Sequence, residues 1–173
     1  EDDVGVGKLL HDLSLIDQDF AKHSVAVSFV SVMLAHSLKW RGGKATATVS
    51  LGGLLHDIGY KELPPHLLSL KRSEMKPDEV ELYESHPQRG MIVLRDFSEI
   101  SKEVAAVVGE HHEMPGGNGF PRGLKSDRIF PMARCVSLSD IYCHLILKTA
   151  RNPKPMPIHE AVVYLQHSVG HDF

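Results

Sequence analysis

Residues 17–40 read "DQDFAKHSVAVSFVSVMLAHSLKW", a stretch whose apolar side chains recur with the spacing of an α-helix. Asp19, His23, Val27, Val30 and Leu34 fall at i, i+4, i+8, i+11 and i+15, which places them on one face of that helix. This face is apolar except at its first two members. The stretch therefore predicts a helix that carries a carboxylate and an imidazole towards the protein core.

Helical stripes also run through residues 46–60, 98–113, 132–148 and 155–165. The 98–113 stripe carries His111 on the face of its valines, and the 132–148 stripe places Asp140 on the face of an alanine and a valine. In the last stripe the side chains expected to point inward are Ile158, Ala161, Val162 and Leu165. We expect Gly52 and Gly53, inside the 46–60 stripe, to mark close helix packing.

Helix-breaking prolines separate these helical stretches. Residues 61–77 hold Pro64, Pro65 and Pro77 and a basic cluster, so we expect a surface loop there. Pro87 lacks an N–H, so the helix that begins near residue 77 is expected to bend or stop at His86. No alternating strand pattern of useful length is present. The sequence predicts an all-α fold, a compact single-domain bundle of about six to eight helices.

The chain has 173 residues, the usual size of one domain that buries its own core. We expect residues 1–18 to form an N-terminal lead-in or linker helix and residues 19–173 to form the domain. Because the chain begins abruptly and spans little beyond this domain, we expect a fragment of a longer regulatory protein.

Composition excludes several classes of protein. A formal net charge of −3 provides no basic field of the kind that holds nucleic acid polymers. The longest strongly apolar run, Val25 to Ala35, is shorter than the ~20 residues that span a bilayer, so we expect no membrane segment. Cys135 and Cys143 lie in no CxxC or zinc-binding spacing, which indicates buried thiols in a reducing, cytoplasmic compartment.

Polar side chains stand at positions where the rest of the pattern is apolar. They are Asp19, His23, His56, Asp57, His86, His111, His112 and Asp140. A single buried histidine is usually satisfied by a backbone carbonyl. Five histidines and three aspartates cannot easily satisfy one another, because a neutral imidazole is half donor and half acceptor while a carboxylate only accepts. A divalent cation resolves this excess of acceptors.

Imidazole and carboxylate ligands without thiolate suit iron, manganese, cobalt or zinc. The set exceeds the three or four ligands of one catalytic ion, which argues for at least two ions. Two ions ~3.5 to 4 Å apart, bridged by a carboxylate, can activate water and stabilise the leaving oxygen of a phosphoester. Two dications would also outweigh the aspartates and attract a phosphodiester.

Five motifs carry a family resemblance. In order they are "HSVAVS", "LLHDIGYKELPPHLL", "ESHPQRGMIVL", "GEHHEMPGGNGFP" and "ARCVSLSDIY". Their order and separations resemble the HD-GYP branch of the HD metal-dependent phosphohydrolases, from about Asp19 to the C-terminal "HSVGHDF". The resemblance implies an all-helical domain with two or three metal ions, iron first and manganese next. It also implies hydrolysis of cyclic di-GMP in bacterial signalling, with possible signalling-protein partners.

Carried over by motif, one ion would be held by His23, His56, Asp57 and Asp140. Asp57 would bridge to a second ion held by His86, His111 and His112. Asp19 falls where members with three ions carry a glutamate. It is a candidate either for a third ion or for orienting His23.

The sequence departs from the family pattern around the substrate. Tyr60, a candidate catalytic position, stands where the family has a lysine, and Lys61 beside it is expected to point about 100° away. Gly116 replaces an aspartate, Phe120 replaces the tyrosine of the GYP motif, and Cys143 replaces a second aspartate. The remaining candidates for substrate binding, besides Phe120, are Arg151 and Lys154, which align only with a small insertion.

These departures leave three readings open. The first is a phosphodiesterase that hydrolyses cyclic di-GMP. The second is a weak or inactive metal-loaded receptor or adaptor, and the third is a phosphohydrolase of another nucleotide. Outside the motifs, surface or ordinary core roles are expected for His11, His36, His66, His144, His159, His167 and His171. Glu113 is expected to be structural rather than a base, and the glycines after it to let backbone approach a bulky ligand.

Overall fold

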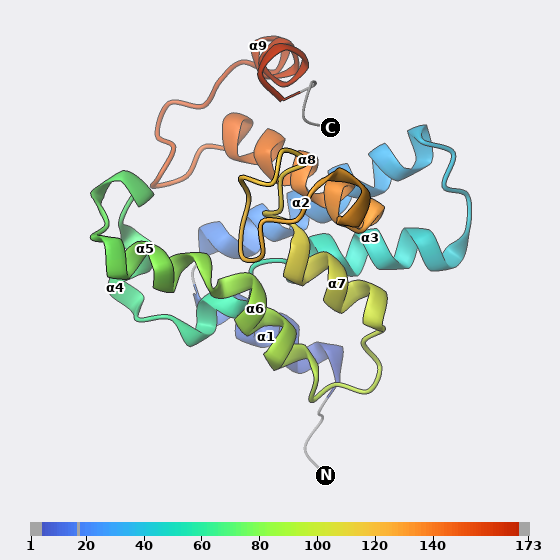
Figure 1. Ribbon diagram of the computed structural model, residues 1–173, viewed down its shortest axis with the longest axis horizontal. Coiled ribbons are helices and arrows are strands. Elements are labelled where there is room, and N and C mark those ends of the chain that lie inside the picture. The colour runs from blue at the N-terminus through green and yellow to red at the C-terminus, as the bar shows by residue number, and fades with distance from the viewer. Residues whose placement is uncertain (1–4, 17, 170–173) are drawn as a thin grey trace.

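The structure is a computed structural model that describes residues 5–16 and 18–169. Its α-helices are α1 (Val6–Ile16), α2 (Gln18–Ser37), α3 (Gly43–Leu55), α4 (Pro65–Ser69), α5 (Pro77–Glu84), α6 (His86–Leu94), α7 (Lys102–Glu110), α8 (Pro131–Ile146) and α9 (Ile158–Tyr164) (Figure 1). Short 3₁₀ segments follow α3 (η1, Ile58–Glu62) and α4 (η2, Arg72–Glu74), and a third lies in the loop before α8 (η3, Ser126–Arg128). A π-helical turn (Leu165–Val169) extends α9. The all-α prediction is confirmed, with eight of these helices seven residues or longer. His171, for which a surface or ordinary core role was expected, lies outside the described residues.

The central helices pack through small and β-branched side chains. α2 lies against α3 and α8, and α7 lies against α3 and α6. One buried cluster joins Val27 of α2, Val49 of α3, Val107 of α7 and Val136 of α8. A Cβ on Gly52 would lie 2.5 Å from Val107 Cγ1, so the glycine pair is required for the close packing that was expected.

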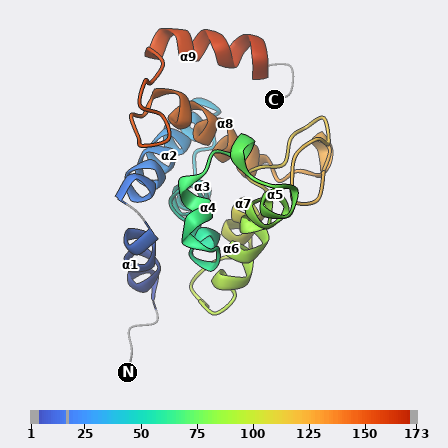
Figure 2. The same cartoon turned by 90° about the vertical axis from the view of Figure 1, so that its left-hand side faces the viewer.

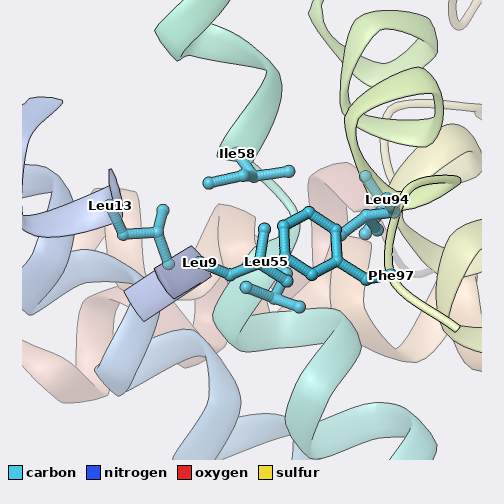
Figure 3. Close-up of a cluster of buried hydrophobic side chains, with 7 residues drawn as sticks. Leu9, Leu13, Leu55, Ile58, Leu94 and Phe97 are labelled. Atoms are coloured by element: carbon cyan, nitrogen blue, oxygen red, sulfur yellow. The ribbon is translucent and has the colours of Figure 1, made fainter. Parts of the chain in front are cut away.

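A second buried cluster ties α1 to the domain (Figure 3). Leu9 and Leu13 of α1 contact a set that includes Leu55, Ile58 and Phe97. α1 therefore contributes to the core on which η1 rests. A domain boundary between residues 18 and 19 stays a prediction.

The break at Pro87 positions part of the site. α5 ends at Glu84 and α6 begins at His86 with Pro87 in its first turn, as the sequence predicted. A Cβ on Gly59 would lie 2.0 Å from the His86 carbonyl oxygen, so only glycine lets the segment after α3 approach α6 this closely. This contact brings Asp57 next to His86.

Two expectations about exposed segments are wrong. In α9, Ala161 is buried as expected, but Ile158 is 63% and Val162 43% exposed, because α9 lies at one end of the molecule with α8 as its main neighbour. Within residues 61–77, the short helix α4 buries Leu67 completely, so this connector is not a simple surface loop. None of the helices described here has the length and apolar character needed to cross a membrane.

Candidate metal centre

Five parts of the chain deliver the predicted ligands to one place. α2 contributes His23, the end of α3 contributes His56 and Asp57, and α8 contributes Asp140. α6 begins with His86, and the pair His111 and His112 follows directly after α7. Their ligand atoms form two groups, one of Asp57, His86, His111 and His112 and the other of His23, His56 and Asp140, with the atoms of each group within 4.8 Å of one another. All are buried except His112, which is half-buried.

Backbone carbonyls fix the orientation of three imidazoles. Nδ1 of His56 lies 2.7 Å from the Gly53 oxygen, and Nδ1 of His86 and of His111 each lie 2.8 Å from the carbonyl three residues earlier. A carbonyl only accepts, so each Nδ1 donates its hydrogen. The opposite nitrogen, Nε2, is therefore the one turned towards the other ligands, which is the arrangement that prepares histidine for metal binding.

Around Asp57 the atoms that meet are mostly acceptors, whereas in the other group His23 Nε2 donates to Asp140 Oδ1 at 2.7 Å. Nε2 of His86 and Nε2 of His111 face each other at 3.4 Å, and they lie 3.4 Å and 3.7 Å from Asp57 Oδ1. Nε2 of His56 is buried and makes no hydrogen bond. Such a set of lone pairs and carboxylates is costly without a positive charge between them. The donor set therefore fits divalent metal.

Asp57 lies between the two groups. Its Oδ2 is 3.2 Å from His56 Nε2, while its Oδ1 faces His86 and His111. One carboxylate thus directs one oxygen towards each group, which is the geometry of a bridging ligand.

The buried charges shift one another's pKa values. Burial opposes ionisation of Asp57 and Asp140, but the surrounding histidines outweigh it and hold both carboxyl pKa values well below the ordinary value. Burial lowers the pKa of His111 and His112. For His56 the neighbouring carboxylates overcome burial and raise its pKa well above the ordinary value. The aspartates are therefore ionised at neutral pH, as metal ligands must be.

His144 lies at the site, although only a surface or ordinary core role was expected for it. Its Nδ1 lies 2.9 Å from Asp140 Oδ1 and 3.1 Å from the Asp140 carbonyl oxygen, and its ring meets that of His23 edge-on at 4.2 Å. Its side chain is 57% exposed, and the Asp140 carboxylate outweighs desolvation and raises the pKa of His144 to about 9. The spacing Asp140–His144 is i, i+4 on α8, so helical periodicity could have identified this contact.

Asp19 lines a cavity beside the ligands that is described below. Its Oδ2 accepts a hydrogen bond of 2.9 Å from the Ala150 amide, which ties α2 to the segment after α8. Among the described residues it joins neither group of candidate ligands.

Tyr60 is buried between aromatic rings. It stacks on His86 with ring centroids 4.1 Å apart and donates a 2.7 Å hydrogen bond to the Tyr83 hydroxyl. Burial raises its pKa well above the ordinary value, so it stays neutral. Lys61 points away, as expected, and binds Asp12 at 2.7 Å. Neither residue places a cation at the family's lysine position.

A cavity of about 690 Å³ opens beside the ligands. Its walls include Phe20, His23, Asp57, Tyr60, His144 and Arg151. The Arg151 guanidinium donates to the Leu68 carbonyl and lies 5.2 Å from the centroid of the Phe20 ring. Lys154 is exposed and does not line this cavity. Of the two predicted basic substrate contacts, the fold thus brings only Arg151 to the site.

Phe120 packs against His112 and is not among the residues that line this cavity. Its ring is tilted by 35° over His112, with centroids 4.6 Å apart, and its amide donates to the His112 carbonyl at 3.1 Å. Glu113, fully buried, accepts the Arg122 and Leu124 amides at 2.7 Å each, which supports the structural role expected for it. A Cβ on Gly119 would lie 2.4 Å from the His112 oxygen. That glycine is therefore required for the loop to pack against the backbone of His112. The approach of a bulky ligand to this loop stays a prediction.

Comparison with known proteins gives a consistent result. The sequence matches the family described as HD domain over residues 11–173. It is 34% identical over 149 residues to a cyclic di-GMP phosphodiesterase of Pseudomonas aeruginosa, covering 82% of this chain and 36% of that protein. It is 32% identical over 126 residues to a probable cyclic di-GMP phosphodiesterase of Vibrio cholerae, covering 69% of this chain and 28% of that protein.

A solved structure shows the same fold. The HDG"Y"P protein of Bdellovibrio bacteriovorus superimposes with a TM-score of 0.70 at 30% identity, covering 86% of this chain and 46% of that one. The chain spans about a third of the length of the curated relatives it matches. These matches and the five ordered motifs lead to one conclusion: the chain belongs to the HD domain family, in its HD-GYP branch.

Proposed function

We propose that this chain is a metal-dependent phosphodiesterase that hydrolyses cyclic di-GMP at the site formed by the two ligand groups. The observation that carries the proposal is the convergence of seven buried or half-buried histidines and aspartates into two groups. Asp57, one of the seven, directs Oδ2 at His56 of one group and Oδ1 at His86 and His111 of the other. The names of the relatives support the substrate. The experiments distinguish this phosphodiesterase from two alternatives, a receptor that binds cyclic di-GMP without turnover and an enzyme for another nucleotide.

We propose two divalent ions, iron as the first candidate and manganese as the second. His23, His56 and Asp140 would hold one, and His86, His111 and His112 the other, with Asp57 shared. A third ion would need Asp19, whose carboxylate already accepts the Ala150 amide. When bound, the ions would supply the Lewis acidity and the activation of water that phosphodiester hydrolysis requires.

The residues of the chain would hold and orient the reacting groups. The carbonyl contacts of His56, His86 and His111 keep each Nε2 facing inward without rearrangement. Arg151 presents a cation on the wall of the cavity that His23 and Asp57 also line, where a phosphate oxygen can accept from it. His144 holds Asp140 from the cavity side.

Arg151→Ala is expected to raise KM for cyclic di-GMP by about 10- to 100-fold, with a smaller effect on kcat, because it removes one charge-assisted hydrogen bond. Steady-state kinetics on the metal-loaded protein measure both constants. Lys154→Ala is the matched control, and its kinetics should equal those of the wild type. If Arg151→Ala and Lys154→Ala changed KM equally, the substrate phosphate would not bind in the cavity beside Arg151.

His144→Ala is expected to weaken metal binding or activity by about 10- to 100-fold, the usual cost of losing a partner that orients a ligand. His144→Gln keeps a side-chain donor and should recover part of the loss, whereas His159→Ala, at an exposed position of α9, should have no effect. Isothermal titration with Mn(II) and activity assays would be run in parallel. Wild-type metal affinity and activity in His144→Ala would rule out this role.

The function is tested by loading the purified chain with Fe(II) or Mn(II) without oxygen, incubating it with cyclic di-GMP and separating the products by chromatography. The proposal expects linear dinucleotide or GMP. Tight binding of cyclic di-GMP without product would identify a receptor. Product from a different cyclic dinucleotide alone would reassign the substrate.

We also propose the bacterial cytoplasm as the compartment and signalling proteins as partners. Cys135 and Cys143 are both free and buried, as is usual for thiols in a reducing compartment. The proposed substrate, cyclic di-GMP, would be available in the same compartment.

A further inference from the structure

Two tyrosines outside the ligand set are joined by a hydrogen bond beside the metal centre. Tyr60 of η1 donates at 2.7 Å to the hydroxyl of Tyr83, which lies in the last turn of α5. Figure 2 shows α4 and α5 on the side of the molecule that faces the viewer. Both tyrosine rings contact His86, Tyr60 by stacking at 4.1 Å and Tyr83 edge-on at 5.6 Å between ring centroids. The pair is therefore packed against a candidate ligand.

The direction of this hydrogen bond leaves Tyr83 with a hydrogen to donate. The side chain of Tyr60 is buried, whereas that of Tyr83 is half-buried. If Tyr83 were the donor, the Tyr60 hydrogen would be buried without an acceptor in the part of the chain that the structure describes. A neutral phenol both donates and accepts. Tyr83 therefore accepts from Tyr60, and its own hydrogen meets no acceptor among the described residues.

Tyr83 lines a second cavity, of about 240 Å³, together with ligands from both groups. His112 of one group and Asp140 of the other lie on its wall, and so does Asp57 between them. The volume is many times the roughly 10–15 Å³ that one water requires, so a phosphate group has room there. Of the described residues, no lysine or arginine lines this cavity. A phosphate oxygen that enters it would meet hydroxyl and imidazole donors instead.

We propose, building on the phosphodiesterase function above, that the Tyr83 hydroxyl donates a hydrogen bond to a phosphate oxygen of the substrate and that Tyr60 positions this hydroxyl. Charge is spread over the phosphoryl oxygens in the transition state, and a donor fixed in advance stabilises it without reorganisation. The smaller and the larger cavity share Asp57, Tyr60 and His144. Cyclic di-GMP has two phosphates, so Arg151 in the larger cavity and Tyr83 in the smaller one can each contact one of them.

Tyr83→Phe isolates the hydroxyl. His86 Nδ1 donates to the backbone carbonyl of Tyr83 at 2.8 Å, a contact that the substitution preserves. With metal content unchanged, kcat for cyclic di-GMP is expected to fall about 10- to 100-fold, because one hydrogen bond to a charged oxygen is lost. Tyr142→Phe, at a half-buried position of α8 that lines neither cavity, is the matched control and should keep wild-type kinetics. A wild-type kcat in Tyr83→Phe would overturn the proposal.

A double-mutant cycle tests whether Tyr60 acts through Tyr83. Tyr60→Phe keeps a ring against His86 and is expected to lower kcat about 3- to 10-fold, because the Tyr83 hydroxyl is no longer held. Added to Tyr83→Phe, it should cause no further loss, since the group that it positions is already absent. If the two losses multiplied in the double variant, Tyr60 would act independently of Tyr83 and its positioning role would be refuted.

Binding of inorganic phosphate distinguishes this contact from the proposed hydrolysis. Isothermal titration of the Mn(II)-loaded protein should give a Kd for phosphate about 3- to 10-fold higher in Tyr83→Phe than in the wild type, with no change in Tyr142→Phe. That difference, in a protein that forms no product from cyclic di-GMP, would support the contact and refute the hydrolysis. Product from the wild type, with equal kcat and equal phosphate affinity in Tyr83→Phe, would refute the contact alone. A metal-loaded wild type that binds no phosphate would also overturn the contact.

Discussion

Asp57→Asn is expected to lower hydrolysis of cyclic di-GMP at least about 1,000-fold, which corresponds to about 4 kcal/mol of activation free energy. The two oxygens of Asp57 face different ligand groups, so replacing the carboxylate with a neutral amide is expected to weaken metal binding in both groups. The shape of the side chain is preserved, which separates loss of the charge from loss of packing. Activity and metal content per chain, measured on the same sample, give the result.

Asp12→Asn is the matched control for Asp57→Asn. Asp12 is also an ion-paired aspartate, held by Lys61, but it belongs to neither ligand group. Its substitution should leave metal content and activity unchanged. If Asp57→Asn retained a full complement of metal and wild-type activity, the shared carboxylate would have no part in the centre.

Removal of metal is expected to lower the melting temperature by about 10 °C. A ligand present at 1,000 times its Kd stabilises the folded state by about 4 kcal/mol, and 1 kcal/mol shifts Tm by about 2–4 °C for a chain of this size. Without metal, the buried lone pairs around Asp57 lose the positive charge that compensates them. Calorimetry before chelation, after chelation and after return of Mn(II) would show the loss and its recovery.

The double variant His86→Ala, His111→Ala provides the control for this experiment. It removes two of the four ligands of one group, so chelation should shift its Tm by less than that of the wild type. A wild type whose Tm is unchanged by chelation would show that the cluster is stable without metal. Protons on histidines such as His56 would then compensate the carboxylates.

Helical periodicity was sufficient to predict where most of the helices lie, because it reports directly which side chains are buried. His23 and Val27 share a face in the sequence pattern and are both buried in α2. The same rule failed for α9. Periodicity shows that a helix has an apolar face, but not whether the fold supplies a surface to cover it, and Ile158 is exposed for that reason.

The ligand set could be predicted because its members break an apolar pattern, whereas the substrate side could not. Arg151 and Lys154 are equivalent in sequence, and only the bend of the chain after α8 separates them. His144 lies on the exposed edge of α8, where the apolar pattern gives it no role, and only its i, i+4 spacing from Asp140 indicates the contact. Its contact with Asp140 depends on side-chain orientation. The closure of the glycine loop onto Glu113 likewise depends on backbone contacts that no residue pattern reports.

The central claim is that seven residues hold two metal ions that share Asp57. Its most direct test is a crystal structure of the chain grown with Fe(II) in the absence of oxygen, with anomalous diffraction data collected on both sides of the iron absorption edge. We predict two anomalous peaks about 3.5 to 4 Å apart. One should lie among His23, His56 and Asp140 and the other among His86, His111 and His112, with one Asp57 oxygen directed at each. A single peak, or two peaks that do not share Asp57, would contradict the account.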